Sequence, residues 1–195
     1  MSDLSRRSLL QSIALSATVG GLTLEAAQHV HGVAAQEKTA GAYKPKGLNA
    51  HEYKTLEKLA DFIIPTDENS KGAVAAGAPE FIDLLASQNP QLLAIYTGGI
   101  AWLDFTMQRH NSTDFLGAKT EQQTALLDLI AYRKNESPEL GPGIKFFEWA
   151  RRMVVDAYYT SPIGIKDVGY MGNTAVSKFE IPQEAIDYAL KRSPV

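Results

Sequence analysis

Apolar residues recur at helical spacing through most of the chain beyond residue 48, and no run of residues alternates as a β-strand does. The first predicted helix begins at Asn49, which with Glu52 has the spacing of a capping box, and it ends before Pro65. One face of this helix collects the apolar residues Tyr53, Leu56, Leu59, Ala60 and Ile63. The pattern predicts an all-α protein.

Prolines mark the start of the next two predicted helices. Pro79 opens a short second helix after a polar loop over residues 66–77. Asn89-Pro90 opens a third, which runs to residues 107–109 and contains the pair Gly98-Gly99. Because each glycine costs about 1 kcal/mol relative to alanine in a helix, the pair predicts close helix packing or a kink.

Three more helices complete the pattern, so that we expect about six helices in all. Thr120 with Gln123 is a second capping box, followed by an apolar face of Leu126, Leu129 and Ile130. Gly141-Pro142-Gly143 predicts a break before a helix over residues 144–159, and the last helix begins at Pro182. These helices are expected to form one domain with long irregular loops.

The stretch 161–176 lacks helical periodicity and is rich in glycine, proline and aromatic residues, so a loop is expected there. Residues 156–173, which overlap this stretch, hold three tyrosines, three glycines and a methionine. Loops of this length are usually functional or disordered, and the apolar content argues against disorder. Tyrosine and methionine are common in the cores of protein interfaces. Two interpretations stay open. In the first, the loop contacts a partner. In the second, it folds back on its own core, with glycines supplying positive φ. Both can be true if one face of the loop contacts the partner and the other contacts the core.

The N-terminus has the pattern of a twin-arginine export signal. Arg6 and Arg7 precede a mildly apolar, uncharged stretch over residues 9–24, and Val33-Ala34-Ala35 supplies small residues for cleavage before Gln36. The stretch is shorter than the roughly 20 apolar residues that a membrane-spanning helix needs. We therefore divide the chain into a signal peptide at 1–35, a linker at 36–47 and a helical domain at 48–195.

The alternative for this segment is an N-terminal amphipathic helix that belongs to the folded protein. Gly20-Gly21 and the lack of charge between residues 9 and 24 favour the export signal.

Composition narrows the possible functions. The 195 residues include no cysteine, which excludes disulfides, thiol nucleophiles, iron–sulfur ligation and c-type haem attachment on this chain. A net charge of −3 leaves no basic surplus for a phosphate backbone, so nucleic acid is not an expected partner.

The sequence contains no recognisable catalytic motif. His51 and His110 are the histidines outside the predicted signal, and we expect them to face solvent rather than a metal. The acidic residues Asp61, Asp67, Glu68 and Asp83 form an acid–base pair only if folding brings two of them together, and residues 66–69 are better explained as a polar loop than as a calcium site. We expect no catalytic residue, cofactor site or metal site on this chain.

Three blocks of the sequence resemble a known family. They are Ala60-Asp61-Phe62-Ile63-Ile64-Pro65-Thr66-Asp67, then Ala76-Gly77 leading to Phe81-Ile82-Asp83, and Tyr158-Tyr159-Thr160-Ser161-Pro162-Ile163-Gly164, continued by Lys166 to Asn173. Together with the twin-arginine start, these blocks are similar to subunit 3 of gluconate 2-dehydrogenase, the small or gamma subunit of membrane-associated flavin dehydrogenases.

The resemblance implies a non-catalytic subunit that pairs with a large FAD-containing subunit of the glucose–methanol–choline type. That partner oxidises a sugar or sugar acid, is exported together with the small subunit, and often passes its electrons to a cytochrome c subunit. The resemblance places the complex in the periplasm, where it is membrane-associated through its other subunits. It implies that the small chain serves export, maturation and stability of the catalytic subunit.

On this hypothesis Arg6 and Arg7 are read by the twin-arginine translocase. The expected contact residues for the catalytic subunit are Tyr158, Tyr159, Pro162, Ile163, Gly164, Tyr170 and Met171. Two rival hypotheses are an enzyme in its own right that uses carboxylates in a helical cleft, and a stand-alone periplasmic binding or structural protein. The concentration of apolar residues near the C-terminal loop disfavours a free monomer.

Overall fold

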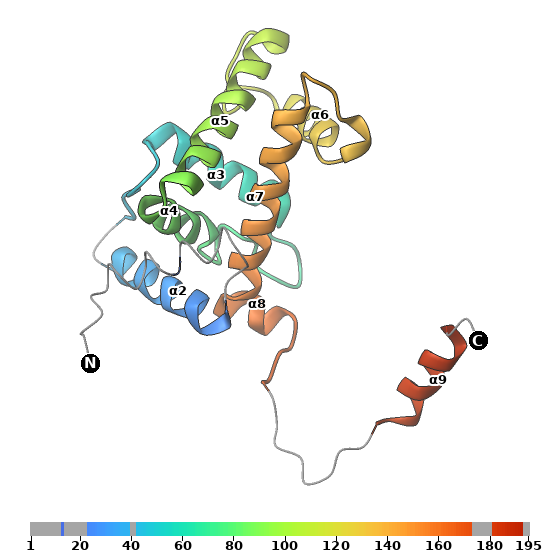
Figure 1. Cartoon of the computed structure of the whole chain (residues 1–195). Helices are drawn as coiled ribbons and strands as arrows, with labels where there is room; N and C mark the ends of the chain where they lie inside the picture. The colour runs from blue at the N-terminus through green and yellow to red at the C-terminus, as the bar shows by residue number, and fades with distance from the viewer. Residues whose placement is uncertain (1–12, 14–22, 40–41, 173–180, 193–195) are drawn as a thin grey trace.

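The computed structural model describes residues 13, 23–39, 42–172 and 181–192, and in these residues the chain is helical without a β-strand (Figure 1). The helices in this part are α2 (Leu24–Thr39), α3 (Ala50–Ile63), α4 (Ala78–Gln88), α5 (Pro90–Asn111), α6 (Thr120–Ile130), α7 (Gly141–Tyr159), α8 (Pro162–Asp167) and α9 (Gln183–Arg192), with a 3₁₀ turn at Arg133–Asn135. The expected all-α, single-domain fold is confirmed. Helices α2 and α8 add to the six that the pattern predicts.

The predicted start of α3 is confirmed. The Asn49 side chain accepts a hydrogen bond from the Glu52 N–H at 2.9 Å, and the Glu52 carboxylate accepts one from the Asn49 N–H at 2.8 Å. This reciprocal pair satisfies two of the N–H groups that a helix start leaves free. The apolar face behind it is buried as expected: Tyr53, Leu56, Leu59 and Ala60.

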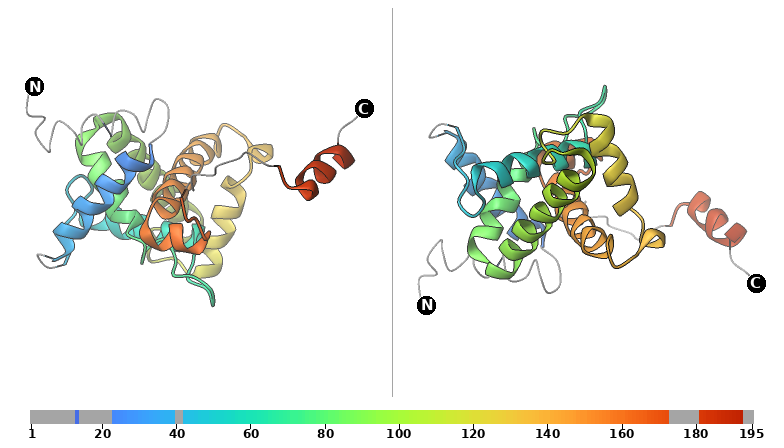
Figure 2. Two further views of the ribbon diagram at one scale, coloured as in Figure 1. Left: turned by 90° about the horizontal axis from the view of Figure 1, so that it is seen from below. Right: turned by 90° about the horizontal axis from the view of Figure 1, so that it is seen from above.

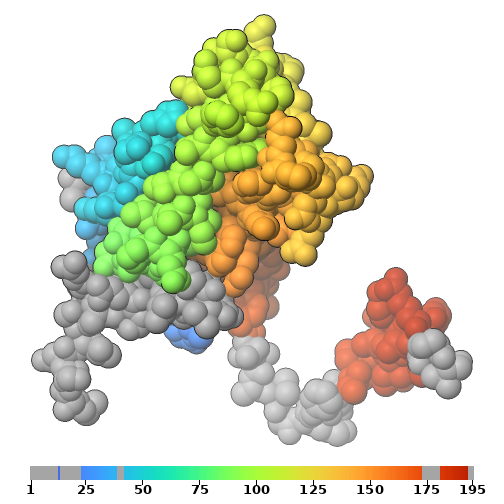
Figure 3. Space-filling view, turned by 45° about the horizontal axis from the view of Figure 1, so that its top comes forward, coloured from blue at the N-terminus to red at the C-terminus, as the bar shows by residue number. Residues whose placement is uncertain are grey.

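Helix α7 lies at the centre of the fold and packs against α3, α4, α5 and α6 (Figures 1 and 2). Its buried face includes Phe146, Ala150, Val154 and Ala157. Helix α5 runs beside it, as the space-filling view shows (Figure 3). Each large apolar side chain buried in this way contributes about 1.5–3 kcal/mol to folding.

The close packing predicted at Gly98-Gly99 is found at the second glycine. A Cβ atom at Gly99 would lie 2.0 Å from the ring of Phe146, whereas a Cβ at Gly98 would meet nothing within 4 Å. The missing side chain at Gly99 therefore lets the ring of α7 rest against the backbone of α5. No close contact of this kind explains the glycine at position 98.

A buried carboxylate fastens the segment before α3 to α4. Asp83 accepts hydrogen bonds from the Tyr43 hydroxyl at 2.7 Å and from the N–H groups of Lys46, Gly47 and Leu48 at 2.6, 3.1 and 2.8 Å. Its side chain is fully buried. Four donors satisfy the charge that burial would otherwise penalise, so the group has a structural role.

The second predicted capping box is displaced by one residue. Helix α6 begins at Thr120, and the Gln122 side chain accepts a hydrogen bond from the Lys119 N–H at 2.9 Å. Gln123, the expected partner of Thr120, is instead buried and donates to the Phe115 carbonyl at 2.6 Å. That buried bond fixes which face of the helix turns inward.

Two further expectations near α6 and α7 are corrected. Leu126 and Ile130 are buried, but Leu129 is 48% exposed because it lies off the face that Gln123 shares with them. Gly141-Pro142-Gly143 does not break the chain but forms the first turn of α7. Proline is tolerated there because the first N–H groups of a helix have no intrahelical partner.

Helix α9 stands apart from the other helices (Figures 1 and 3). No residue of α9 is buried, and its apolar residues Tyr188 and Leu190 are 59% and 68% exposed. The predicted last helix is therefore present but contributes nothing to the core.

Helix α2 packs on α4 and covers one end of the body (Figures 1 and 2). Ala27 and Val30 are fully buried and Ala34 is 5% exposed, so one face of α2 belongs to the core. The helix includes the expected cleavage point after Ala35 and continues to Thr39, into the segment predicted as a linker. Gln, Glu and Lys at residues 36–38 are good helix formers, which explains the continuation.

Candidate functional site

The structure divides the expected partner-contact residues into two groups. Tyr159 is 44% exposed, Tyr170 51% and Met171 91%, and Pro162 and Ile163 lie at least partly at the surface. Tyr158 and Gly164 are buried within this chain. Arg6 and Arg7 lie outside the described residues.

Tyr158 is buried because it ties the end of α7 to two other segments. Its hydroxyl lies 2.5 Å from the Ser70 hydroxyl and donates to the Asp167 carboxylate at 3.1 Å. Burial is the largest cause of its raised pKa. The second of the two interpretations of this stretch, packing against the chain's own core, therefore describes Tyr158.

Gly164 is buried because the chain turns back sharply after α7. A Cβ at this position would lie 2.1 Å from the Tyr158 carbonyl oxygen. The expected loop is in fact helix α8, capped by the Ser161 hydroxyl, which accepts from the Gly164 N–H at 3.0 Å. Ser161-Pro162 is a recognisable N-cap followed by a proline at the first helical position, and this signal was available in the sequence.

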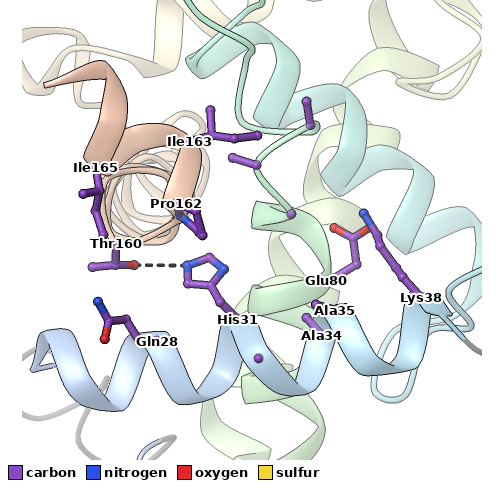
Figure 4. A pocket seen from close by; sticks show the side chains of 14 residues that line it. Gln28, His31, Ala34, Ala35, Lys38, Glu80, Thr160, Pro162, Ile163 and Ile165 are labelled. Atoms are coloured by element: carbon purple, nitrogen blue, oxygen red, sulfur yellow. Dashed lines mark hydrogen bonds and ion pairs between the residues drawn. The ribbon is translucent and has the colours of Figure 1, made fainter. Parts of the chain in front are cut away.

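Beside α8 lies a groove of about 460 Å³, which we call the α2 groove (Figure 4). It is lined by α2, by residues 75–77, by Glu80 of α4, and by Thr160, Pro162, Ile163 and Ile165. Most of the lining is apolar, and four of the polar side chains on it are Gln28, His31, Lys38 and Glu80. An apolar groove with a few polar groups is a typical binding site.

His31 projects from α2 into the α2 groove (Figure 4). Its Nε2 lies 3.2 Å from the Thr160 hydroxyl, and its ring lies against Phe81 with centroids 4.7 Å apart. Burial lowers the pKa of His31, while a hydrogen bond to the Ala157 backbone partly opposes the shift. The neutral imidazole is therefore the form that fits between α2 and the body.

Glu80 lies at the other end of the α2 groove. Its Oε1 is 2.5 Å from the ammonium of Lys38 on α2, and its side chain is 7% exposed. Burial, the Glu80 charge and a hydrogen bond between the Tyr53 side chain and the Glu80 carboxylate raise the pKa of Tyr53. A buried carboxylate needs a charged partner, and at this end of the α2 groove Lys38 of α2 supplies it.

Two of the acidic residues considered for an acid–base pair are engaged by other hydrogen-bond donors. Asp83 is engaged by its four donors, and exposed Asp67 accepts from the N–H groups of Asn69 and Ser70, both at 2.8 Å, in a local turn. These contacts support the polar-loop interpretation of residues 66–69. Over the described ranges, no group of three histidine or acidic side chains could hold a metal ion.

The His51 side chain is 40% exposed, in agreement with the expectation that it faces solvent, and it is also paired. Its Nε2 lies 2.7 Å from the Asp104 carboxylate, and this contact joins α3 to α5. Asp104 also accepts from the Phe115 N–H at 3.0 Å. The pair therefore links three segments of the fold.

A second hollow of about 530 Å³ lies between the C-terminal half of α5 and α6. Met107, Leu126, Leu129 and Leu140 supply its apolar lining. It contains none of the expected partner-contact residues. Among helices of the described residues, none has the length and apolar character to cross a membrane.

The fold defines a small helical protein with a largely apolar groove beside α8, and with exposed tyrosine and methionine residues in the segments before and after α8. The family model described as gluconate 2-dehydrogenase subunit 3 matches residues 50–177. This chain therefore belongs to the gluconate 2-dehydrogenase subunit 3 family, whose name is that of one subunit of a multi-subunit dehydrogenase. Searches of curated proteins and of solved structures gave no match.

Proposed function

We propose that this chain is the non-catalytic small subunit of a periplasmic, FAD-dependent sugar or sugar-acid dehydrogenase. The observation that carries the proposal is the family match over residues 50–177, which includes α8 and the exposed residues around it. On this proposal FAD is bound by a large catalytic subunit, and a cytochrome c subunit accepts the electrons.

The surface near α8 supports a role in binding another protein. Tyr159, Tyr170 and Met171 present apolar surface to solvent, and Ile163 continues it into the α2 groove. Single exposed apolar residues are common, but several exposed within one short stretch of chain favour an interface. Tyr159 also packs edge-on against Tyr158, at 5.0 Å between ring centroids, so it is held in place before a partner arrives.

The proposed second role is export. Arg6 and Arg7 open a twin-arginine signal, and this route carries folded proteins. A catalytic subunit bound to the small subunit in the cytoplasm would cross with it, and the bound small subunit would then stabilise it by mass action.

Co-purification tests the subunit role. A tag placed after Val195 is used to recover the chain from native periplasm and membranes, and the visible spectrum and bound proteins are recorded. We expect a yellow complex with a larger flavoprotein that oxidises a sugar or sugar acid. A colourless chain recovered alone would contradict the proposal and favour a stand-alone periplasmic binding protein.

The export role has its own test. The double variant Arg6→Lys, Arg7→Lys should leave both subunits in the cytoplasm, because the translocase reads the arginine pair. The matched control is Arg151→Lys, an exposed residue of α7, which should export normally. Normal export of the catalytic subunit beside the double variant would exclude the carrier role.

A further inference from the structure

Helix α2 covers a surface that would otherwise be apolar and exposed. Beneath it lie Phe81, which is fully buried, and Ala76, which is 9% exposed. The contact from α2 is made largely by small side chains, Ala27, Val30 and Ala34. Small contact residues bury little area each, so α2 is held less firmly than a helix with large core side chains.

Two polar contacts add to the hold of α2 on the body. His31 meets Thr160, and Lys38 pairs with Glu80. Lys38 is 44% exposed, so solvent screens its pair with the carboxylate. These contacts therefore hold α2 on the body only weakly.

The covered surface is continuous with the exposed residues near α8. Pro162 and Ile163 line the α2 groove on the side opposite α2 (Figure 4). Tyr159 is the last residue of α7, three positions before Pro162 in the chain. A protein that contacts the exposed residues therefore reaches the edge of the surface that α2 covers.

We propose that the surface of α4, α7 and α8 beneath α2 is the docking surface for the catalytic subunit, which binds there by displacing α2. This inference rests on the proposed function, since it requires that subunit to exist. The expected occupant is a segment with an apolar face and a cationic side chain. That cation would take the place of Lys38, because the buried Glu80 carboxylate loses its charged partner when α2 leaves.

Displacement of α2 has a consequence for the predicted signal peptide. Residues 24–35 of α2 fall in the segment predicted as the export signal, so a docked α2 holds the end of that signal on the body. If the catalytic subunit and α2 compete for one surface, binding of the subunit releases the signal peptide from the body. By linkage, a signal peptide bound to another protein would in turn favour binding of the subunit.

The test uses the absence of native cysteine. In the full chain, His31→Cys and Thr160→Cys place two thiols where side chains now touch across the groove. A short thiol-reactive cross-linker that contains a reducible disulfide then fixes α2 to the body. The probe is the flavoprotein that co-purifies with the wild-type chain, and its binding is measured before and after reduction of the linker.

We expect the cross-linked chain to bind the flavoprotein at least about tenfold more weakly than the same chain after reduction, since only the released state is competent. Circular dichroism of both forms verifies that the fold is kept. Equal binding before and after reduction would overturn the inference while leaving the proposed function in place. Failure of the wild-type chain to recover any flavoprotein would overturn the proposed function itself.

A second variant tests the same competition in the opposite direction. Val30→Asp puts a charge into the contact between α2 and the body and should release α2. The affinity for the flavoprotein should then rise, because docked α2 no longer reduces the fraction of chains that can bind it. Weaker binding by this variant would contradict displacement, because it would show that α2 supports the partner contact.

Discussion

The carboxylate of Asp83 and the phenol of Tyr43 lie 2.7 Å apart and join helix α4 to a segment 40 positions earlier in the chain. Burial and the Asp83 charge both raise the pKa of Tyr43, so the phenol keeps its proton and remains a donor. Because the three N–H groups that follow also point to Asp83, one side chain fixes the path by which the chain enters α3.

We expect Asp83→Asn to destabilise the protein by about 2–4 kcal/mol. The amide keeps one acceptor oxygen but turns an NH₂ group toward donors that need an acceptor. Urea unfolding of the variant against wild type measures the change. Asp61→Asn, at an exposed position of α3, is the matched control and should change stability by less than about 0.5 kcal/mol.

The adjacent glycines of α5 should respond in opposite directions to the same substitution. Gly99→Ala drives a methyl group into the Phe146 ring and should cost about 1–3 kcal/mol. Gly98→Ala meets nothing within 4 Å and should stabilise by up to about 1 kcal/mol, because alanine favours the helix. Thermal unfolding of both variants compares them directly, and equal effects would contradict the packing of α5 on α7.

Two buried tyrosines provide a second contrasting pair. The Tyr96 hydroxyl is buried without a hydrogen-bond partner, so Tyr96→Phe should stabilise by about 1 kcal/mol. The Tyr158 hydroxyl contacts Ser70 and Asp167, so Tyr158→Phe should destabilise by about 1–2 kcal/mol. Denaturant midpoints measure both, and destabilisation by Tyr96→Phe would mean that its hydroxyl makes a favourable contact.

The lowered pKa of His31 predicts a pH dependence. The unfolded chain takes up a proton near the ordinary histidine pKa of 6.5, whereas the folded chain does so only at lower pH. Between these values the unfolded state holds more protons, so stability is complete above about pH 6.5 and falls as the pH falls below it. The charged groups that line the same groove are Lys38 and Glu80.

Unfolding free energies near pH 7.5 and near pH 5.5 test this dependence. Wild type should lose more stability between the two than His31→Gln, which keeps a polar side chain but does not titrate. Identical losses in the two proteins would show that His31 is not buried against the body.

The helical core was largely predictable from sequence because its signals are local. Asn49 with Glu52 gave the start of α3, Pro79 and Asn89-Pro90 gave α4 and α5, and the glycine pair pointed to the contact at Gly99. Each of these depends on residues within one or two turns of each other. Helical periodicity and capping motifs involve only such neighbouring residues, so they can be recognised in the sequence.

The features that were not predicted depend on residues far apart in the chain. Tyr158 was expected to face a partner, but it is turned inward by Ser70, 88 positions earlier. Composition alone could not show this, since tyrosine is equally suited to interface and interior. The buried face of α2 likewise could not be predicted, because it is defined by the contact with α4 in the folded chain.

The Ala35–Gln36 bond, where cleavage is predicted, lies inside α2. Proteases bind the chain in extended form, and Ala34 beside this bond is buried, so cleavage of the folded chain would require this turn to unwind and leave the body first. If the predicted export and cleavage take place, an N-terminus at Gln36 would mean that the chain was cut either before α2 docked or after it was released.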